Sequence, residues 1–255
     1  MTATPARMTY ADYLQLDRLL SAQQPLSNLH DETLFIVIHQ TKELWLKQML
    51  HELVFAIRLV DRDSFAPAYK ALSRVSRIQS VMTLSWDVLA TLTPVDYLAF
   101  RDVLGTSSGF QSAQFRELEY RLGLKNPGYL QHHDEGSEAR AGLQDALDRP
   151  SLRDASHAAL ERSGFDLADR SDAALAAAWV QVYRDADRWF ELYQLAEKLV
   201  DLDDALASWR HKHVLTVERI IGNKTGTGGS AGAAYLRSTL DKRVFPELWA
   251  LRTDL

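Results

Sequence analysis

The stretch that decides the fold runs from residue 34 to residue 60 and reads LFIVIHQTKELWLKQMLHELVFAIRLV. Its opening, LFIVIHQ, would suit a β-strand if it stood alone, because it is apolar and partly β-branched. It continues, however, without a glycine or a proline into a further run of helix-forming residues. The uninterrupted length therefore predicts one helix of about 25–30 residues, with Asp31 at its N-cap.

Most of the remaining sequence also follows the helical period. We predict long helices over about 66–91 and 179–221, the second with room for one break and ended by Gly222, and shorter helices over about 111–122 and 233–241. The segment TLTPVDYLAFRDVLG predicts a short helix capped by Thr93, with Pro94 in its first position and Gly105 at its end. Residues 131–178 are rich in alanine and charge, and they predict short helices that form a peripheral insertion. The expected fold is a single all-α helical bundle spanning residues 1–255.

Composition excludes several classes of function. The chain has 255 residues, a formal net charge of −5 and no cysteine. A negative charge gives no reason to expect nucleic acid or an anionic membrane as a partner, and no apolar run is long enough to span a bilayer. The N-terminus lacks the apolar core of a signal peptide, so we expect a cytoplasmic protein. Without cysteine, any metal must be held by histidine or by oxygen ligands.

Two histidines stand close together in WRHKHVLTVERIIGNKTGTGGSAG, residues 209–232. Positions two apart on a helix differ by about 200°, so His211 and His213 point to opposite sides. His213 shares a stripe with apolar residues: Leu202, Leu206, Trp209, Val217 and Ile220. His211 aligns with polar residues and is expected to face solvent. His213 is either a buried neutral imidazole with a hydrogen-bond partner or a ligand.

His39 has a similar position on the first long helix, where Phe35 precedes it by one turn. Two core-facing histidines on two long helices suit a buried iron porphyrin, in which one would bind the iron and the other would face the ligand side. A cytochrome with two histidine ligands or a structural polar network would fit equally well. Spacing alone leaves these alternatives open.

Two further features have both a structural and a functional interpretation. Tyr97 and Arg101 are one turn apart, so the arginine could form an internal ion pair or, with the tyrosine, clamp a substrate carboxylate. The glycine-rich stretch 223–232 follows a helix rather than a strand, which excludes a dinucleotide fingerprint, and it lacks the spacing of a phosphate-binding loop. It is either a connector or a loop that covers a ligand, with Thr227 supplying a hydroxyl.

Taken together, these segments resemble the tryptophan 2,3-dioxygenase family of haem enzymes. The resemblance is carried, in family order, by TYADYLQLDRLLSAQQPLS, LFIVIHQTKELWLKQMLHEL, LTPVDYLAFRDVLGTSSGFQSAQFRELEY, LGLKNP, WRHKHVLTVERIIGNKTGTGGSAGAAYLRSTL and FPELWALRT. It extends from about residue 9 to the C-terminus, except for 131–178. The resemblance implies an all-α fold with non-covalent haem b buried between helices, usually in a homotetramer.

The resemblance also implies roles for individual residues. His213 would be the proximal iron ligand, and Ser108 and Trp86 would lie beside the haem. His39 would hydrogen-bond the indole N–H and Phe35 would pack on the indole, while Arg101 and Tyr97 would hold the substrate carboxylate and Thr227 the ammonium group. The N-terminal segment 1–20 would complete the pocket of a neighbouring subunit through Tyr10, Tyr13 and Leu14.

The implied reaction is cleavage of the indole C2–C3 bond of L-tryptophan by O₂ to give N-formyl-L-kynurenine, the first step of tryptophan catabolism. Three alternatives remain open at this point. The chain could oxygenate a modified tryptophan, for example as a monooxygenase of secondary metabolism. It could be a non-catalytic sensor of haem or tryptophan, or a helical interaction module without haem.

Overall fold

The computed structural model describes residues 8–167 and 171–255, so the parts of the expected segments 1–20 and 131–178 that fall at 1–7 and 168–170 lie outside the described residues. Every regular element in the described ranges is helical, and none of their residues forms a β-strand. The predicted all-α class is confirmed.

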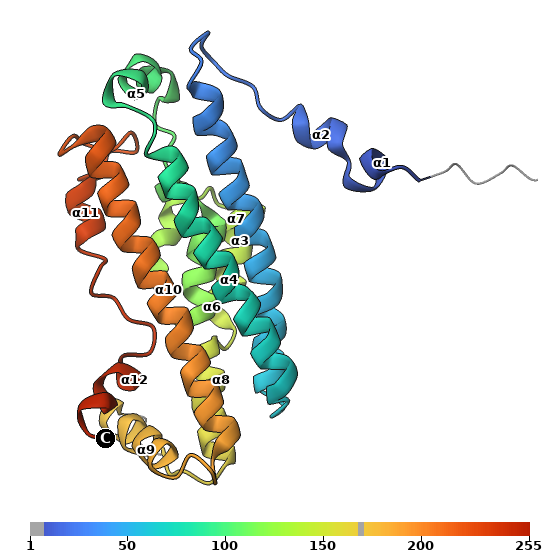
Figure 1. Cartoon of the computed structure of the whole chain (residues 1–255), viewed down its shortest axis with the longest axis vertical. Coiled ribbons are helices and arrows are strands. Elements are labelled where there is room, and N and C mark those ends of the chain that lie inside the picture. The colour runs from blue at the N-terminus through green and yellow to red at the C-terminus, as the bar shows by residue number, and fades with distance from the viewer. Residues whose placement is uncertain (1–7, 168–170) are drawn as a thin grey trace, which may run out of the picture.

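Three long helices form the frame of the molecule: α3 (Glu32–Val60), α4 (Phe65–Leu89) and α10 (Phe190–Ile221). Helix α4 packs against both α3 and α10 along their lengths (Figure 1). The stretch 34–60 lies within one helix, as its length predicts. Asp31 occupies the N-cap position of α3 but makes no capping hydrogen bond. The Glu32 carboxylate instead accepts from the backbone N–H of Leu26 at 2.7 Å and of Ser27 at 2.8 Å.

Shorter helices surround this frame. They are α1 (Tyr10–Leu14), α2 (Leu16–Leu20), α5 (Pro94–Phe100), α6 (Ala113–Leu122), α7 (Glu138–Asp148), α8 (Leu152–Arg162), α9 (Asp172–Arg184), α11 (Ala233–Arg237) and α12 (Pro246–Ala250), with 3₁₀ turns at Arg101–Leu104, Gly109–Gln111, Pro127–His132 and Leu251–Thr253. The predicted cap of α5 is confirmed, because Thr93 and Asp96 form a reciprocal capping box. The predicted helix over 179–221 is broken between Arg184 and Phe190, and Gly222 ends it with φ 59°.

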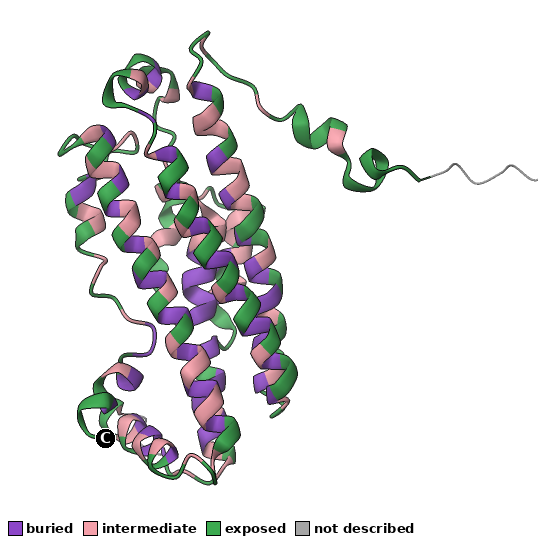
Figure 2. Cartoon of the chain, viewed as in Figure 1, coloured by how far each residue is buried: buried purple, intermediate pink, exposed green. Residues whose placement is uncertain are grey.

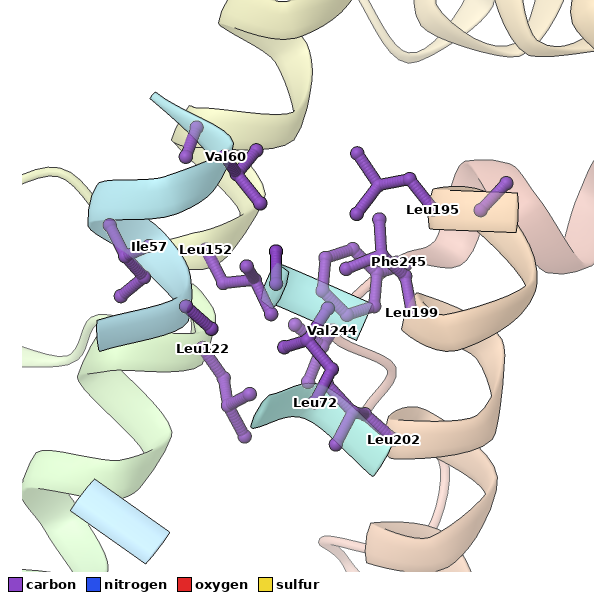
Figure 3. Packing of buried hydrophobic residues seen from close by; sticks show 14 of the residues in the cluster. Ile57, Val60, Leu72, Leu122, Leu152, Leu195, Leu199, Leu202, Val244 and Phe245 are labelled. Atoms are coloured by element: carbon purple, nitrogen blue, oxygen red, sulfur yellow. The ribbon is translucent and has the colours of Figure 1, made fainter. Parts of the chain in front are cut away.

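The second half of the segment 131–178 is part of the main core. Leu152 and Leu160 of α8 and Leu175 of α9 belong to one buried apolar cluster with residues of α3, α4 and α10. Figure 3 shows Leu152 within this cluster, on the side of Ile57 and Leu122, and Figure 2 shows where buried residues lie along the helices. Part of the segment expected to form a peripheral insertion therefore contributes to the main core, because the alanine-rich composition conceals large apolar side chains at core positions.

Truncating Trp179 tests this integration. Its side chain is fully buried, so Trp179→Ala is expected to lower the free energy of unfolding by about 3–5 kcal/mol through lost burial and the cavity left behind. Urea unfolding followed by circular dichroism measures the change. Phe190→Ala provides the control, because Phe190 is 59% exposed. Equal small losses in both variants would show that α9 does not stabilise the bundle.

The N-terminal helices α1 and α2 extend away from the bundle (Figure 1), and neither contains a buried residue. Within residues 8–167 and 171–255, no helix combines the length and the apolar character needed to cross a bilayer.

Candidate functional site

A cavity of about 770 Å³ lies among α3, α4, α10 and the segments 104–116 and 226–236. Its walls include apolar side chains from all three long helices and polar side chains from the two segments. Both histidines singled out by the sequence line it, His39 from α3 and His213 from α10. Its volume lies in the range of sites that bind cofactors and small molecules.

His39 is held in one orientation by its own helix. Its Nδ1 lies 2.7 Å from the carbonyl oxygen of Phe35, and the two rings are 4.2 Å apart between centroids. Because a carbonyl only accepts, Nδ1 carries the proton and Nε2 keeps a free lone pair. Burial lowers the pKa of His39 to about 4, and nearby Lys42 adds to this shift. His39 is therefore a neutral imidazole with an unused acceptor at neutral pH.

His213 lies between two tryptophans. Its ring stacks on Trp86 with centroids 4.3 Å apart and planes at 11°, and the Trp209 centroid is 5.1 Å away. Burial, followed by the charges of Lys42 and His39, lowers the pKa of His213 to about 3. The helical-wheel prediction for this pair is confirmed, since His213 lines the cavity while His211 is exposed and bonds the Ala207 carbonyl at 3.0 Å.

The glycine-rich loop folds against the segment that follows α5. The Thr227 hydroxyl donates to the Ser107 carbonyl at 2.6 Å. A Cβ at Gly228 would lie 2.7 Å from the Ser108 Cβ, so only glycine permits this close approach. The loop is therefore packed across the edge of the cavity, and Thr227 and Ser108 both line it.

Tyr97 and Arg101 lie at the same end of the molecule. Tyr97 is buried, lines the cavity and packs on Phe35 with centroids 5.8 Å apart. Burial raises its pKa, which keeps the hydroxyl protonated. The Arg101 guanidinium donates to the carbonyl of Thr225 in the glycine-rich loop. Arg101 opens the 3₁₀ turn after α5 and bonds the loop rather than an internal carboxylate. Unlike Tyr97, it is not among the residues that line the cavity.

Three predicted residues lie elsewhere. Tyr10 and Tyr13 are each 76% exposed and Leu14 is 40% exposed, all on α1 away from the bundle. They contribute nothing to the cavity of their own chain.

The sequence did not single out Lys42, one turn after His39 on α3. Lys42 lines the cavity, is buried, and places Nζ 2.9 Å from the centroid of the Trp86 ring. Burial lowers its pKa to about 6. Its position one helical turn from a cavity histidine was the only signal that could have identified it.

The two histidines do not form a metal site made by protein alone. In the part of the chain that the structure describes, no group of three or more His, Asp or Glu side chains is arranged to hold a metal ion. A metal between His39 and His213 would therefore need most of its ligands from a cofactor, as in a porphyrin.

Comparison with known proteins identifies the family of this chain. The family model described as tryptophan 2,3-dioxygenase matches residues 2–168 and 150–255. Tryptophan 2,3-dioxygenase of Caulobacter vibrioides is 63% identical over 97% of this chain and 98% of its own length. The enzymes of the same name from Bacillus cereus and from a Bradyrhizobium species are 53% and 52% identical, each over 93% of its own length. This chain belongs to the tryptophan 2,3-dioxygenase family.

Proposed function

We propose that this protein is a haem-dependent dioxygenase that cleaves the C2–C3 bond of the indole of L-tryptophan with O₂ and forms N-formyl-L-kynurenine. The observation that carries the proposal is a single cavity lined by a neutral histidine from α3, a neutral histidine from α10, and Tyr97 and Thr227 of the predicted amino-acid clamp. Full-length similarity to enzymes of this name supports it.

The residues present fit haem b. Apart from the two histidines and a few other polar side chains, the long helices line the cavity with apolar residues, while the segments 104–116 and 226–236 supply serine and threonine hydroxyls, which suits a flat apolar ring with two carboxylates at one edge. The His213 side chain makes no hydrogen bond to another described residue, and the Nε1 atoms of Trp86 and Trp209 are buried without a partner in the described structure. His213 would hold the iron, with Trp86 and Ser108 beside the ring. When bound, ferrous haem supplies the site for O₂ and the redox chemistry of oxygen insertion.

His39 would orient the indole rather than remove its proton. With Nδ1 donating to the Phe35 carbonyl, Nε2 is the free acceptor for an indole N–H. An indole N–H is a weak acid, and an imidazole whose pKa lies near 4 is a weak base, so proton abstraction is disfavoured. Phe35, stacked beside His39, would pack on the indole and fix its plane.

Arg101, Tyr97 and Thr227 would bind the amino-acid part of the substrate. A substrate carboxylate is a stronger acceptor than the Thr225 carbonyl that Arg101 now bonds, so the guanidinium would exchange one for the other. Thr227 would offer its hydroxyl oxygen to the ammonium group. Because Arg101 also bonds the loop that carries Thr227, substrate binding and closure of the loop would be linked.

The N-terminal segment would complete the site of a second subunit in a homotetramer. Exposed Tyr10, Tyr13 and Leu14 are apolar or aromatic, and they extend away from the bundle on α1. Large exposed apolar side chains on a projecting segment favour contact with another chain.

The pKa of His39 predicts the pH dependence of turnover. Because the folded-state pKa is near 4, kcat/KM is expected to stay flat from about pH 8 to about pH 5 and to fall only near pH 4. The free energy of unfolding should also fall with pH. Because the pKa of His39 in the folded protein lies below the usual 6.5, protonation destabilises the fold as pH falls from 6.5 toward 4. Steady-state kinetics across this range provide the measurement. A break near 6.5 that disappears in His39→Asn would contradict a buried, neutral His39.

The proposed reaction is tested by product identification. Ferrous, haem-loaded protein supplied with L-tryptophan and air should form N-formyl-L-kynurenine, identified by mass spectrometry. The haem-free chain, prepared in parallel, should form none. Full haem loading with no product would instead favour a sensor.

A further inference from the structure

Lys42 places its amine inside the protein without a polar partner. The residue is 6% exposed, and Nζ has no hydrogen-bond partner in residues 8–167 and 171–255. Burying an unpaired amine is costly, and the usual solution is a carboxylate beside it. Here no ion pair joins Lys42 to any carboxylate of the described chain. Packing alone does not account for a lysine at this position.

The contact that Lys42 does make leads to His213. Its Nζ lies 2.9 Å from the centroid of the Trp86 ring, and that ring stacks on His213 at 4.3 Å with an interplanar angle of 11°. The Trp86 Nε1 atom has no hydrogen-bond partner in the described chain, so contacts on its faces hold the indole in place. Lys42, Trp86 and His213 therefore form one contiguous array across α3, α4 and α10.

The surroundings of Lys42 disfavour an ion pair between its amine and a carboxylate of a molecule bound in the cavity. Leu46, one turn after Lys42 on α3, and Met82, one turn before Trp86 on α4, are both apolar and both in the cavity wall. The carboxylate of Glu43, the next residue, already accepts hydrogen bonds from the Ser112 hydroxyl at 2.6 Å and from the Gln114 amide at 2.8 Å. The serine hydroxyls of the cavity and that of Thr227 lie on the segments 104–116 and 226–236, which suit the carboxylate edge of a haem better.

We propose that Lys42 is a positioning residue for the iron-binding imidazole and acts on it through Trp86. The proposal rests on the assignment of His213 as the axial ligand. The amine holds the indole parallel to the imidazole, and its N–H hydrogens place positive potential beside the stacked pair in the neutral form as in the charged form, which adds to it below the Lys42 pKa of about 6. Positive potential near an axial ligand withdraws electron density from it and favours ferrous over ferric iron.

The test uses haem-loaded, full-length protein and two readouts other than turnover. Lys42→Met keeps the length and apolar stem of the side chain and removes the nitrogen. It is expected to lower the midpoint potential of the haem iron. It should also raise and broaden the iron–histidine stretching frequency of the ferrous protein in resonance Raman spectra. Lys47→Met, which changes an exposed lysine on the same helix, is the matched control and should leave both unchanged.

Two further arms separate the possible causes. In a Trp86→Phe background, Lys42→Met should have a much smaller effect, because the coupling passes through the indole. Loading with haem dimethyl ester, which has no free carboxylates, should leave the effect of Lys42→Met intact. Unchanged spectra in Lys42→Met would overturn the proposal, and an effect lost with the ester would replace it by direct pairing with a cofactor carboxylate. Absence of an iron–histidine band in the unaltered protein would instead overturn the assignment of His213.

Discussion

Replacing His213 with alanine is expected to remove the proposed iron ligand and with it stable haem binding and turnover. His213 comes from the middle of α10 and is enclosed by Trp86 and Trp209. Losing an outer partner of a metal ligand costs about 10- to 100-fold in affinity or activity, so losing the ligand itself should exceed about 100-fold. Haem content after gel filtration and the rate of haem transfer to an excess of apomyoglobin measure the effect.

His211→Ala is the matched control for this experiment. It removes a histidine from the same turn of α10, but His211 is exposed and bonds only the Ala207 carbonyl. Its haem content and turnover should remain those of the unaltered protein. Full haem content and turnover in His213→Ala would show that the iron is held from another position.

Replacing Arg101 with alanine is expected to weaken the use of L-tryptophan without altering the haem. The guanidinium lies beside the glycine-rich loop, where its partner is the Thr225 carbonyl. Loss of a buried charge pair with the substrate carboxylate should cost about 2–5 kcal/mol, which is a fall of about 30- to 5,000-fold in kcat/KM. The loss should appear mainly in KM, while the absorption spectrum of the haem stays the same.

Arg101→Lys distinguishes charge from geometry. A lysine keeps the charge but cannot form the paired hydrogen bonds of a guanidinium, so only part of the activity should return. Indole-3-propionate has the carboxylate but no ammonium group, and as an inhibitor it should lose affinity in Arg101→Ala as the substrate does. Unchanged kinetics in both variants would place the carboxylate site elsewhere.

The main features of the fold could be predicted from local sequence. Uninterrupted length distinguishes helix from strand at 34–40, and the capping box of Thr93 with the glycine at 222 marks helix ends correctly. The role of α8 and α9 in the core could not be predicted, because it depends on which distant helices their few large side chains meet. Leu152 and Trp179 are ordinary apolar residues until tertiary packing buries them.

The candidate site shows the same division. Helical spacing correctly predicts that His213 faces inward and His211 outward. Spacing alone could not show that His39 and His213 line the same cavity, and the family resemblance was needed for that expectation. Neither helical spacing nor the family resemblance pointed to Lys42, because the proposed role of this residue depends on its contact with Trp86 on another helix.

The most direct test of the central claim is a count of oxygen atoms. Ferrous, haem-loaded protein would be given L-tryptophan and ¹⁸O₂, and the product would be analysed by mass spectrometry under single-turnover conditions. A dioxygenase should form N-formyl-L-kynurenine carrying two labelled oxygens. A product with one labelled oxygen, or turnover of a methylated tryptophan but not of L-tryptophan, would contradict it.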